Sequence, residues 1–167
     1  NAIKDFAAVA TVGRSEYVLV LHPSVPAGGL REFISLARSR PGQLNYASSS
    51  SGSPTHLAGE FFNIIAGVKM QHIPYKGGGP AITDLIGGQV QLLFSVAINV
   101  VPHIKSGRLR AVAVSGKTRL PALPQVPTFI EGGLPEFDAK NWFGVLGPAG
   151  TPKAIIDKLS IEIARIL

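Results

Sequence analysis

The stretch LNYASSSSGSPTHLAGEFF, residues 44–62, has the pattern of a short strand, a polar loop and a helix. Residues 44–47 suit a buried strand. Ser53 followed by Pro54 is a typical helix start, because serine accepts a hydrogen bond from a first-turn amide and proline fits the first helical position. Four serines and a glycine lie in between. A loop between a strand end and a helix start is where open α/β sheets bind ligands.

The alternation of strand and helix continues on both sides of this stretch. Strands are expected at 17–21, 71–75, 90–96 and 109–115, and helices at 30–37, 80–86 and 97–105. Single helices between strands are typical of βαβ units, so the sequence predicts an α/β fold with a mainly parallel, doubly wound sheet flanked by helices. The helix after the serines is expected to carry its core-facing side chains on one face, at Leu57, Phe61, Ile64, Ile65 and Val68.

The last third of the chain has a different composition. Residues 117–135 are rich in proline, which predicts a surface excursion with one short helix. Residues 142–146 suit a further strand. Thr151 is the expected N-cap of a last helix with Pro152 at its first position. The apolar face of that helix is expected to contain Ile155, Leu159 and Ile163.

The composition excludes several classes of function. A chain of 167 residues with 46% hydrophobic residues is long enough for a substantial core. It contains no cysteine, which excludes disulfides, zinc–thiolate sites and a thiol nucleophile. The net charge is +6, but the basic residues are scattered, with few aromatic residues between them, so no nucleic-acid partner is expected. No apolar run approaches the roughly 20 residues that span a bilayer.

Three positions qualify as ligand contacts at strand ends. Residues 48–55 offer hydroxyls and amides before a helix N-terminus, where anions are favoured. Residues 75–79 add a cation and three glycines that permit close backbone approach, before a second helix N-terminus. Ser95 is a polar residue at the end of an apolar strand. The candidate ligand-binding residues are therefore Ser48, Ser49, Ser50, Ser51, Gly52, Ser53, Thr55, Tyr75, Lys76, Gly77 and Ser95.

Each position also has a structural explanation. Ser53 and Ser95 each fit the role of a helix cap, and Lys76 fits a solvated residue on a glycine turn. A catalytic pair of Ser53 and His56 lacks the G-x-S-x-G elbow, and neighbours in sequence do not establish hydrogen-bond geometry. The four histidines, at positions 22, 56, 72 and 103, are expected to be isolated packing or surface residues. No metal site and no cofactor are therefore expected.

Five segments of the chain match one family in register. They are LNYASS (44–49), SPTHLAGE (53–60), HIPYKG (72–77), DLIGGQVQ (84–91) and LPQVPT (123–128). Together they resemble the Bug family, the extracytoplasmic solute receptors of tripartite tricarboxylate transporters. The resemblance implies a non-enzymatic, periplasmic, two-lobed receptor with the type II periplasmic binding protein fold. Such a receptor closes on a small organic acid and passes it to membrane permease subunits.

The resemblance also implies how the chain is divided. Family members are longer at both ends, so residues 17–141 are expected to form the second, ligand-binding lobe. Residues 1–16 would be a crossover from the first lobe, and residues 142–167 the return crossover with one helix. Apolar surface left uncovered in that last segment favours self-association of the fragment. Many relatives carry Asp where this chain has Ser95, which favours plain carboxylates or aromatic acids over amino acids as ligands.

Two other functions share parts of this pattern. The first is a serine hydrolase fragment that uses Ser53 and His56. The second is the effector-sensing lobe of a transcription regulator, which has the same architecture. Loss of ester turnover in a Ser53→Ala variant would indicate the first, and an upstream helix-turn-helix segment the second.

Overall fold

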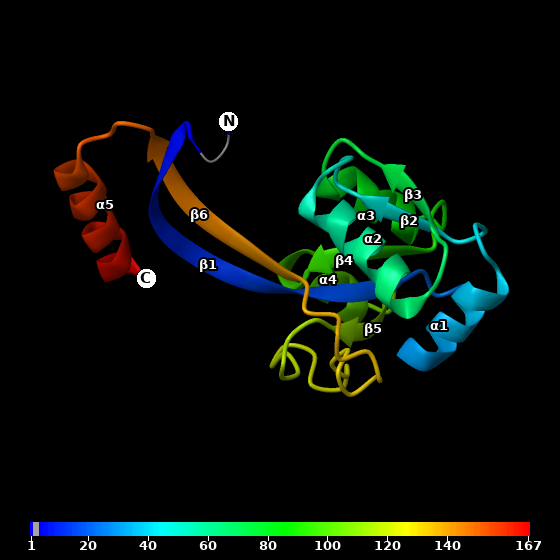
Figure 1. Cartoon of the computed structure of the whole chain (residues 1–167). Coiled ribbons are helices and arrows are strands. Elements are labelled where there is room, and N and C mark those ends of the chain that lie inside the picture. The colour runs from blue at the N-terminus through cyan, green and yellow to red at the C-terminus, as the bar shows by residue number, and fades with distance from the viewer. Residues whose placement is uncertain (2–3) are drawn as a thin grey trace. The chain divides into compact units, whose positions relative to one another are not determined.

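Strand β1 (Phe6–Leu21) contributes to both of the compact units into which the chain divides (Figure 1). The computed structural model describes residues 1 and 4–167. Residues 16–140 form the larger unit, and residues 1–15 and 141–167 form the smaller one. The assignment of these units to the lobes of a receptor stays a prediction.

The larger unit is built on a sheet with the strand order β3-β2-β4-β1-β5. The added strands are β2 (Asn45–Ser48), β3 (Gln71–Pro74), β4 (Leu92–Val96) and β5 (Arg110–Val114). Strand β2 is parallel to both β3 and β4, whereas β1 is antiparallel to both β4 and β5. The α/β prediction is therefore confirmed, but the sheet is mixed because β1 runs against its neighbours.

The direction of β1 follows from the path of the chain after it. Leu21 at the end of β1 and Tyr46 at the start of β2 both pair with Leu92 of β4. The segment between them, which contains α1 (Leu30–Ser39), therefore returns to the edge of the sheet where β1 ends. A strand–helix–strand pattern in the sequence does not distinguish this return from a parallel crossover.

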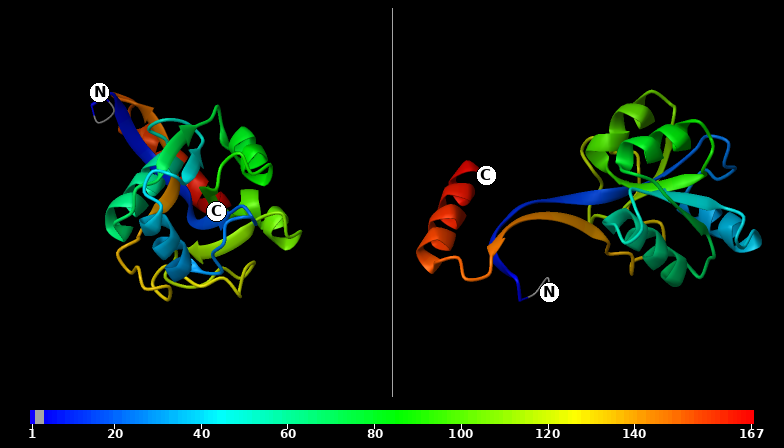
Figure 2. Two further views of the ribbon diagram at one scale, coloured as in Figure 1. Left: turned by 90° about the vertical axis from the view of Figure 1, so that its right-hand side faces the viewer. Right: turned by 90° about the horizontal axis from the view of Figure 1, so that it is seen from above.

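Helices cover both faces of the sheet in the larger unit (Figure 2). Residues of α1 and α2 (Pro54–Ala66) form one core with the sheet, and residues of α3 (Gly78–Ile86) and α4 (Ala97–Lys105) form the other. Burial on both faces explains why strands such as 17–21 are apolar without alternation. The first core contains the large aromatic residues Tyr17, Phe33, Tyr46, Phe62, Phe94, Phe129 and Phe137.

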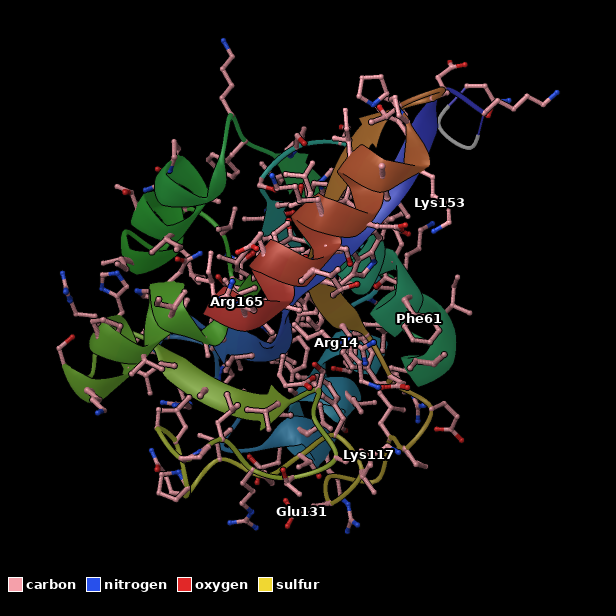
Figure 3. The ribbon with its side chains drawn as sticks, turned by 90° about the vertical axis from the view of Figure 1, so that its left-hand side faces the viewer. Arg14, Phe61, Lys117, Glu131, Lys153 and Arg165 are labelled. Carbon is pink, nitrogen blue, oxygen red and sulfur yellow. The ribbon has the colours of Figure 1, made fainter. Side chains whose placement is uncertain are left out.

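Helix α2 buries a different face from the predicted one. Leu57, Phe61 and Ile64 are exposed by 59%, 37% and 77% (Figure 3 labels Phe61). The buried face consists instead of Ala58, Gly59, Phe62 and Ala66, with Ile65 and Val68 partly buried beside it. Small residues let the helix approach the sheet closely, since a Cβ on Gly59 would lie 2.2 Å from Cε2 of Tyr46.

The excursion after β5 contains turns and no helix between residues 117 and 139, so the predicted short helix is wrong. Its shape depends on Glu131, whose carboxylate accepts hydrogen bonds from Arg119 Nε (3.0 Å) and the Thr128 amide (2.7 Å). The Arg119 hydrogen bond and then the Thr128 bond hold the pKa of Glu131 below its usual value. Phe129 and Phe137 fix the excursion to the core, with ring centroids 4.2 Å apart.

In the smaller unit, β6 (Lys140–Pro148) pairs with β1 and is followed by α5 (Lys153–Ile166). The predicted N-cap is wrong, because Pro152 takes that position and the Thr151 hydroxyl donates to the Pro148 carbonyl at 2.7 Å. Helix α5 has no buried residue, so the predicted apolar face is uncovered.

Across residues 1 and 4–167, none of the helices is long and apolar enough to cross a membrane.

Candidate functional site

Two of the predicted loops adjoin at one edge of the sheet. The serine loop, residues 48–55, follows β2, and the glycine loop, residues 75–79, follows β3. Because β2 and β3 are parallel, their carboxyl ends lie together. The amide of Tyr75 donates to the Ser48 carbonyl at 3.0 Å, and the amide of Gly77 donates to the Ser49 carbonyl at 2.8 Å. The structure therefore brings the two loops into direct contact.

The serine loop is organised by its own side chains. The Ser49 amide donates to Thr55 Oγ1 (3.0 Å), and the Ser50 amide donates to Ser53 Oγ (3.3 Å). Ser53 Oγ in turn donates to the Ser50 carbonyl (2.7 Å) and accepts from the His56 amide (3.3 Å). The prediction that Ser53 caps α2 is confirmed. The loop is a folded turn and not a flexible spacer.

The serines of this loop differ in exposure. Ser48 is fully buried, and its Oγ lies 2.9 Å from the Ser50 carbonyl and 2.6 Å from Nε2 of His72. Ser50 and Ser51 are exposed, and Ser51 has no hydrogen-bond partner in the described part of the chain. Gly52 takes a φ of +76°, which favours glycine at the tip of the turn. Ser48 thus supports the loop from below, while Ser51 faces solvent.

A pair of histidines lies below the serine loop. The rings of His56 and His72 stack with centroids 3.8 Å apart and an interplanar angle of 22°. The Gly52 amide donates to Nδ1 of His56 at 3.0 Å, and Nε2 of His56 is 4.0 Å from Oε1 of Glu60. The prediction that the histidines are isolated is wrong for these two. The i, i+4 spacing of His56 and Glu60 was a usable signal, but the contact with His72 depends on strand register.

The groups around His72 favour the neutral forms of that residue and of Tyr46. The Tyr46 hydroxyl donates to Oε1 of Glu60 at 2.5 Å, and burial, followed by this hydrogen bond, raises the pKa of Tyr46 far above its usual value. Burial lowers the pKa of His72, and the adjacent His56 lowers it further, while Glu60 acts in the opposite direction. Neutral forms of Tyr46 and His72 are therefore favoured below the serine loop.

The glycine loop supplies a free cation. The Tyr75 hydroxyl donates to Oδ2 of Asp84 at 2.8 Å, and burial together with this bond raises the pKa of Tyr75 to about 12. Lys76 is exposed and has neither a hydrogen bond nor an ion pair among the described residues. Gly77 has a φ of +116° and precedes α3, which starts at Gly78 and not at the predicted Pro80. Lys76 thus stands unpaired beside the serine loop.

Ser95 lies near the end of β4 and is only 5% exposed. Its hydroxyl approaches the Val96 carbonyl at 3.4 Å. Val96 is the N-cap of α4 and makes no side-chain cap hydrogen bond, so the alternative that Ser95 caps α4 is wrong. Ligand contact by Ser95 stays a prediction.

The geometry at the serine loop suits anion binding and not nucleophilic attack. Ser53 Oγ donates to a carbonyl, and Nδ1 of His56 is occupied by the Gly52 amide, so these residues form no nucleophile–base pair. Ser48 contacts His72 but is buried. No cluster of three or more His, Cys, Asp or Glu residues suited to a metal occurs among residues 1 and 4–167. Hydroxyls, a helix N-terminus and an ammonium group are the chemistry that remains.

Two surface hollows lie away from the serine loop, and one of them reaches Gly79 of the glycine loop. One of about 390 Å³ is lined in part by Arg110, but Nη1 of that residue donates to the Val25 and Ala27 carbonyls. The other, of about 420 Å³, lies between α3 and α4 and is lined by Ile82, Ile86 and His103 among others. Neither is lined by a predicted site residue. The two loops are therefore the candidate site, because the unpaired cation and the hydroxyls occur there.

Comparison with curated proteins gives relatives along the whole chain. BugT from Bordetella pertussis is 39% identical over 167 residues, which are 100% of this chain and 51% of BugT. A UPF0065 protein from Pseudomonas sp. strain P51 is 34% identical over 165 residues, which are 98% of this chain and 49% of that protein. The chain thus spans about half the length of the curated relatives it matches.

Comparison with solved structures gives the same architecture. R. palustris Rpa4515 with adipate has a TM-score of 0.90 and 35% identity, covering 98% of this chain and 55% of that one. MatC from Rhodopseudomonas palustris with bound malate has a TM-score of 0.89 and 32% identity, covering 96% and 54%. The periplasmic binding protein BugD has a TM-score of 0.86 and 32% identity, covering 95% and 53%. The type II periplasmic binding protein-like fold is confirmed.

A family model adds the last comparison. The model described as tripartite tricarboxylate transporter family receptor matches residues 1–165. This match includes both loops, every predicted site residue and the segments on which the Bug resemblance rests. The chain belongs to the tripartite tricarboxylate transporter receptor family.

Proposed function

We propose that this chain is the ligand-binding part of a periplasmic solute receptor that captures a small organic carboxylate and delivers it to membrane permease subunits. The observation that carries the proposal is the unpaired Lys76 beside the serine loop, in a chain that belongs to this receptor family. The adipate and malate bound to two similar structures support dicarboxylates as the ligand class. Self-association of the chain stays a separate prediction.

Residues of both loops would contact the carboxylate of the ligand. Ser50 and Ser51 are exposed, and their hydroxyls would donate to carboxylate oxygens, while the N-terminus of α2 would add partial positive charge. Lys76 would pair with the same group through a charge-assisted hydrogen bond. The buried Ser48 and Ser53 would hold the loop in shape.

The other predicted contacts belong to the rim of this site. Ser49 and Thr55 are half-buried and bonded to each other, while Tyr75 and Gly77 fix the start of α3. Ser95 places no negative charge at its position, so a plain carboxylate is favoured over a ligand that carries an ammonium group. We expect binding without turnover, in keeping with relatives that are solute receptors. The hydrolase and regulator alternatives have no support in these comparisons.

A thermal-shift screen of the purified chain tests the proposal. A ligand that binds only the folded state raises the melting temperature. We expect a rise with a few mono- or dicarboxylates from a panel that includes adipate, malate and benzoate. The neutral 1,6-hexanediol, which matches adipate in carbon chain, should give no rise. Equal responses to adipate and the diol, or none across the panel, would contradict a carboxylate receptor.

A further inference from the structure

The tip of the serine loop is held by a contact that requires a neutral histidine. The Gly52 amide donates to Nδ1 of His56 at 3.0 Å, so this nitrogen carries no hydrogen. A protonated imidazole donates from both of its nitrogens. Once Nδ1 of His56 takes a proton, two N–H groups face each other and the hydrogen bond to Gly52 is lost.

The neighbouring His72 does not respond in this way. The Ser48 hydroxyl has one hydrogen, which it donates to the Ser50 carbonyl at 2.9 Å. Nε2 of His72, at 2.6 Å, therefore donates to Ser48 Oγ. A further proton on His72 would go to Nδ1 and leave this bond in place. Within the stacked pair, only protonation of His56 breaks a contact to the loop.

The charges around His56 set where its proton would be accommodated. On α2, Oε1 of Glu60 is 4.0 Å from Nε2 of His56. On β2, the Tyr46 hydroxyl donates to the same carboxylate, and on β3 the ring of His72 stacks at 3.8 Å. A charge on His56 would have the Glu60 carboxylate within ion-pair distance and the His72 ring stacked against it. At acidic pH, His56 would therefore lose the hydrogen bond from the Gly52 amide and form an ion pair with Glu60 instead.

We propose that His56 is a positioning residue of the serine loop, which holds the Gly52 amide in the binding-competent conformation only when neutral, so that acid weakens carboxylate binding. This inference rests on the proposed receptor function. Loss of one hydrogen bond lowers the competent population, so the affinity should fall about three- to tenfold as His56 is protonated. Histidines titrate within about pH 5 to 8, which defines the range to measure.

Nuclear magnetic resonance of the ligand-free chain tests the loop directly. Between about pH 8 and pH 5, the Gly52 amide resonance should titrate with the same midpoint as the His56 ring. The His56→Gln variant keeps an acceptor that does not titrate, so its Gly52 resonance should stay constant. The matched His72→Gln variant should keep the titration. A constant Gly52 resonance in the unaltered chain, which needs no variant to observe, would overturn the inference.

Adipate affinity measured by calorimetry tests the link to ligand binding. The ratio of affinities at about pH 8 and about pH 5.5 is compared between the unaltered chain and His56→Gln, so that protonation of adipate itself cancels. We expect a three- to tenfold larger loss in the unaltered chain. Equal ratios would overturn the inference and leave the receptor proposal standing. Absence of adipate binding with a titrating Gly52 would contradict adipate as ligand while supporting the loop mechanism.

Discussion

The serine loop and the glycine loop lie at the same sheet edge but are held in different ways. Side chains organise the first, through Ser48, Ser53 and His56. The second is held by contacts to its neighbours, namely backbone bonds to the serine loop and the Tyr75–Asp84 hydrogen bond, and its Lys76 is left unpaired. The difference indicates separate roles: the hydrogen bonds of the serine loop fix its conformation, and the glycine loop supplies a positive charge through Lys76. Changes below the serine loop should therefore act on stability, and changes in the glycine loop on affinity.

The largest expected effect comes from the packing below the serine loop. A Gly59→Ala variant places a Cβ 2.2 Å from the Tyr46 ring, which forces α2 away from β2. We expect the free energy of unfolding to fall by about 3 kcal/mol in urea denaturation. The control is Gly79→Ala in α3, where a Cβ meets nothing within 4 Å, so stability should be equal or higher. Similar losses in both variants would remove the proposed difference between the loops.

The next effect concerns the charge of the glycine loop. A Lys76→Gln variant should bind carboxylates about tenfold more weakly, since a hydrogen bond to a charged group is worth roughly 1.5 kcal/mol or more. Its unfolding free energy should change by less than about 0.5 kcal/mol, because Lys76 is exposed and makes no hydrogen bond or ion pair in the described structure. The control Lys69→Gln changes an exposed lysine before β3. Calorimetry showing equal affinity losses in the two variants would contradict the role of Lys76.

The cap of α2 should give a smaller effect on stability. Ser53→Ala removes the side chain that accepts from the His56 and Ser50 amides. The unfolding free energy should fall by about 1 kcal/mol. Ser51→Ala, one loop position with no bonded partner in the described chain, should change it by less than about 0.5 kcal/mol. A larger loss of unfolding free energy in Ser51→Ala than in Ser53→Ala would contradict the hydrogen-bonded organisation of the loop.

The smallest expected effect is a pH dependence of stability from His72, which is only partly buried. Its pKa is lowered in the folded state, first by burial and then by His56. The unfolded chain therefore binds more protons at this position in acid, so the unfolding free energy should fall as the pH drops below about 6.5. Urea midpoints across this range should vary less in His72→Gln. An unchanged slope would show that His72 does not contribute.

Local sequence patterns predicted much of the fold. Helix α4 was expected at residues 97–105 and is observed there, and the Ser53–Pro54 pair marked the start of α2. These features depend on neighbouring residues only. The direction of β1 relative to the other strands was not predictable in this way. It depends on where the chain between β1 and β2 returns to the sheet, which is the end at which β1 finishes.

The buried face of α2 and the histidine pair show the same limit. Leu57, Phe61 and Ile64 make an apolar stripe as convincing as Ala58, Phe62 and Ala66, and only close packing against Tyr46 selects the second. His72 reaches His56 because the β2–β3 register places it opposite Tyr46. The loops themselves were predictable, since each follows a strand and precedes a helix. Their internal hydrogen bonds were not.

The central claim is that the serine and glycine loops together form the carboxylate site. A titration of the chain with adipate, followed through its backbone amide resonances, tests this directly, with 1,6-hexanediol as the neutral control. We predict saturable shifts that concentrate at Ser51, Gly52, Thr55, Lys76 and Gly77. Shifts centred on Ile82 and His103 in the hollow between α3 and α4, or equal shifts with the diol, would contradict the account.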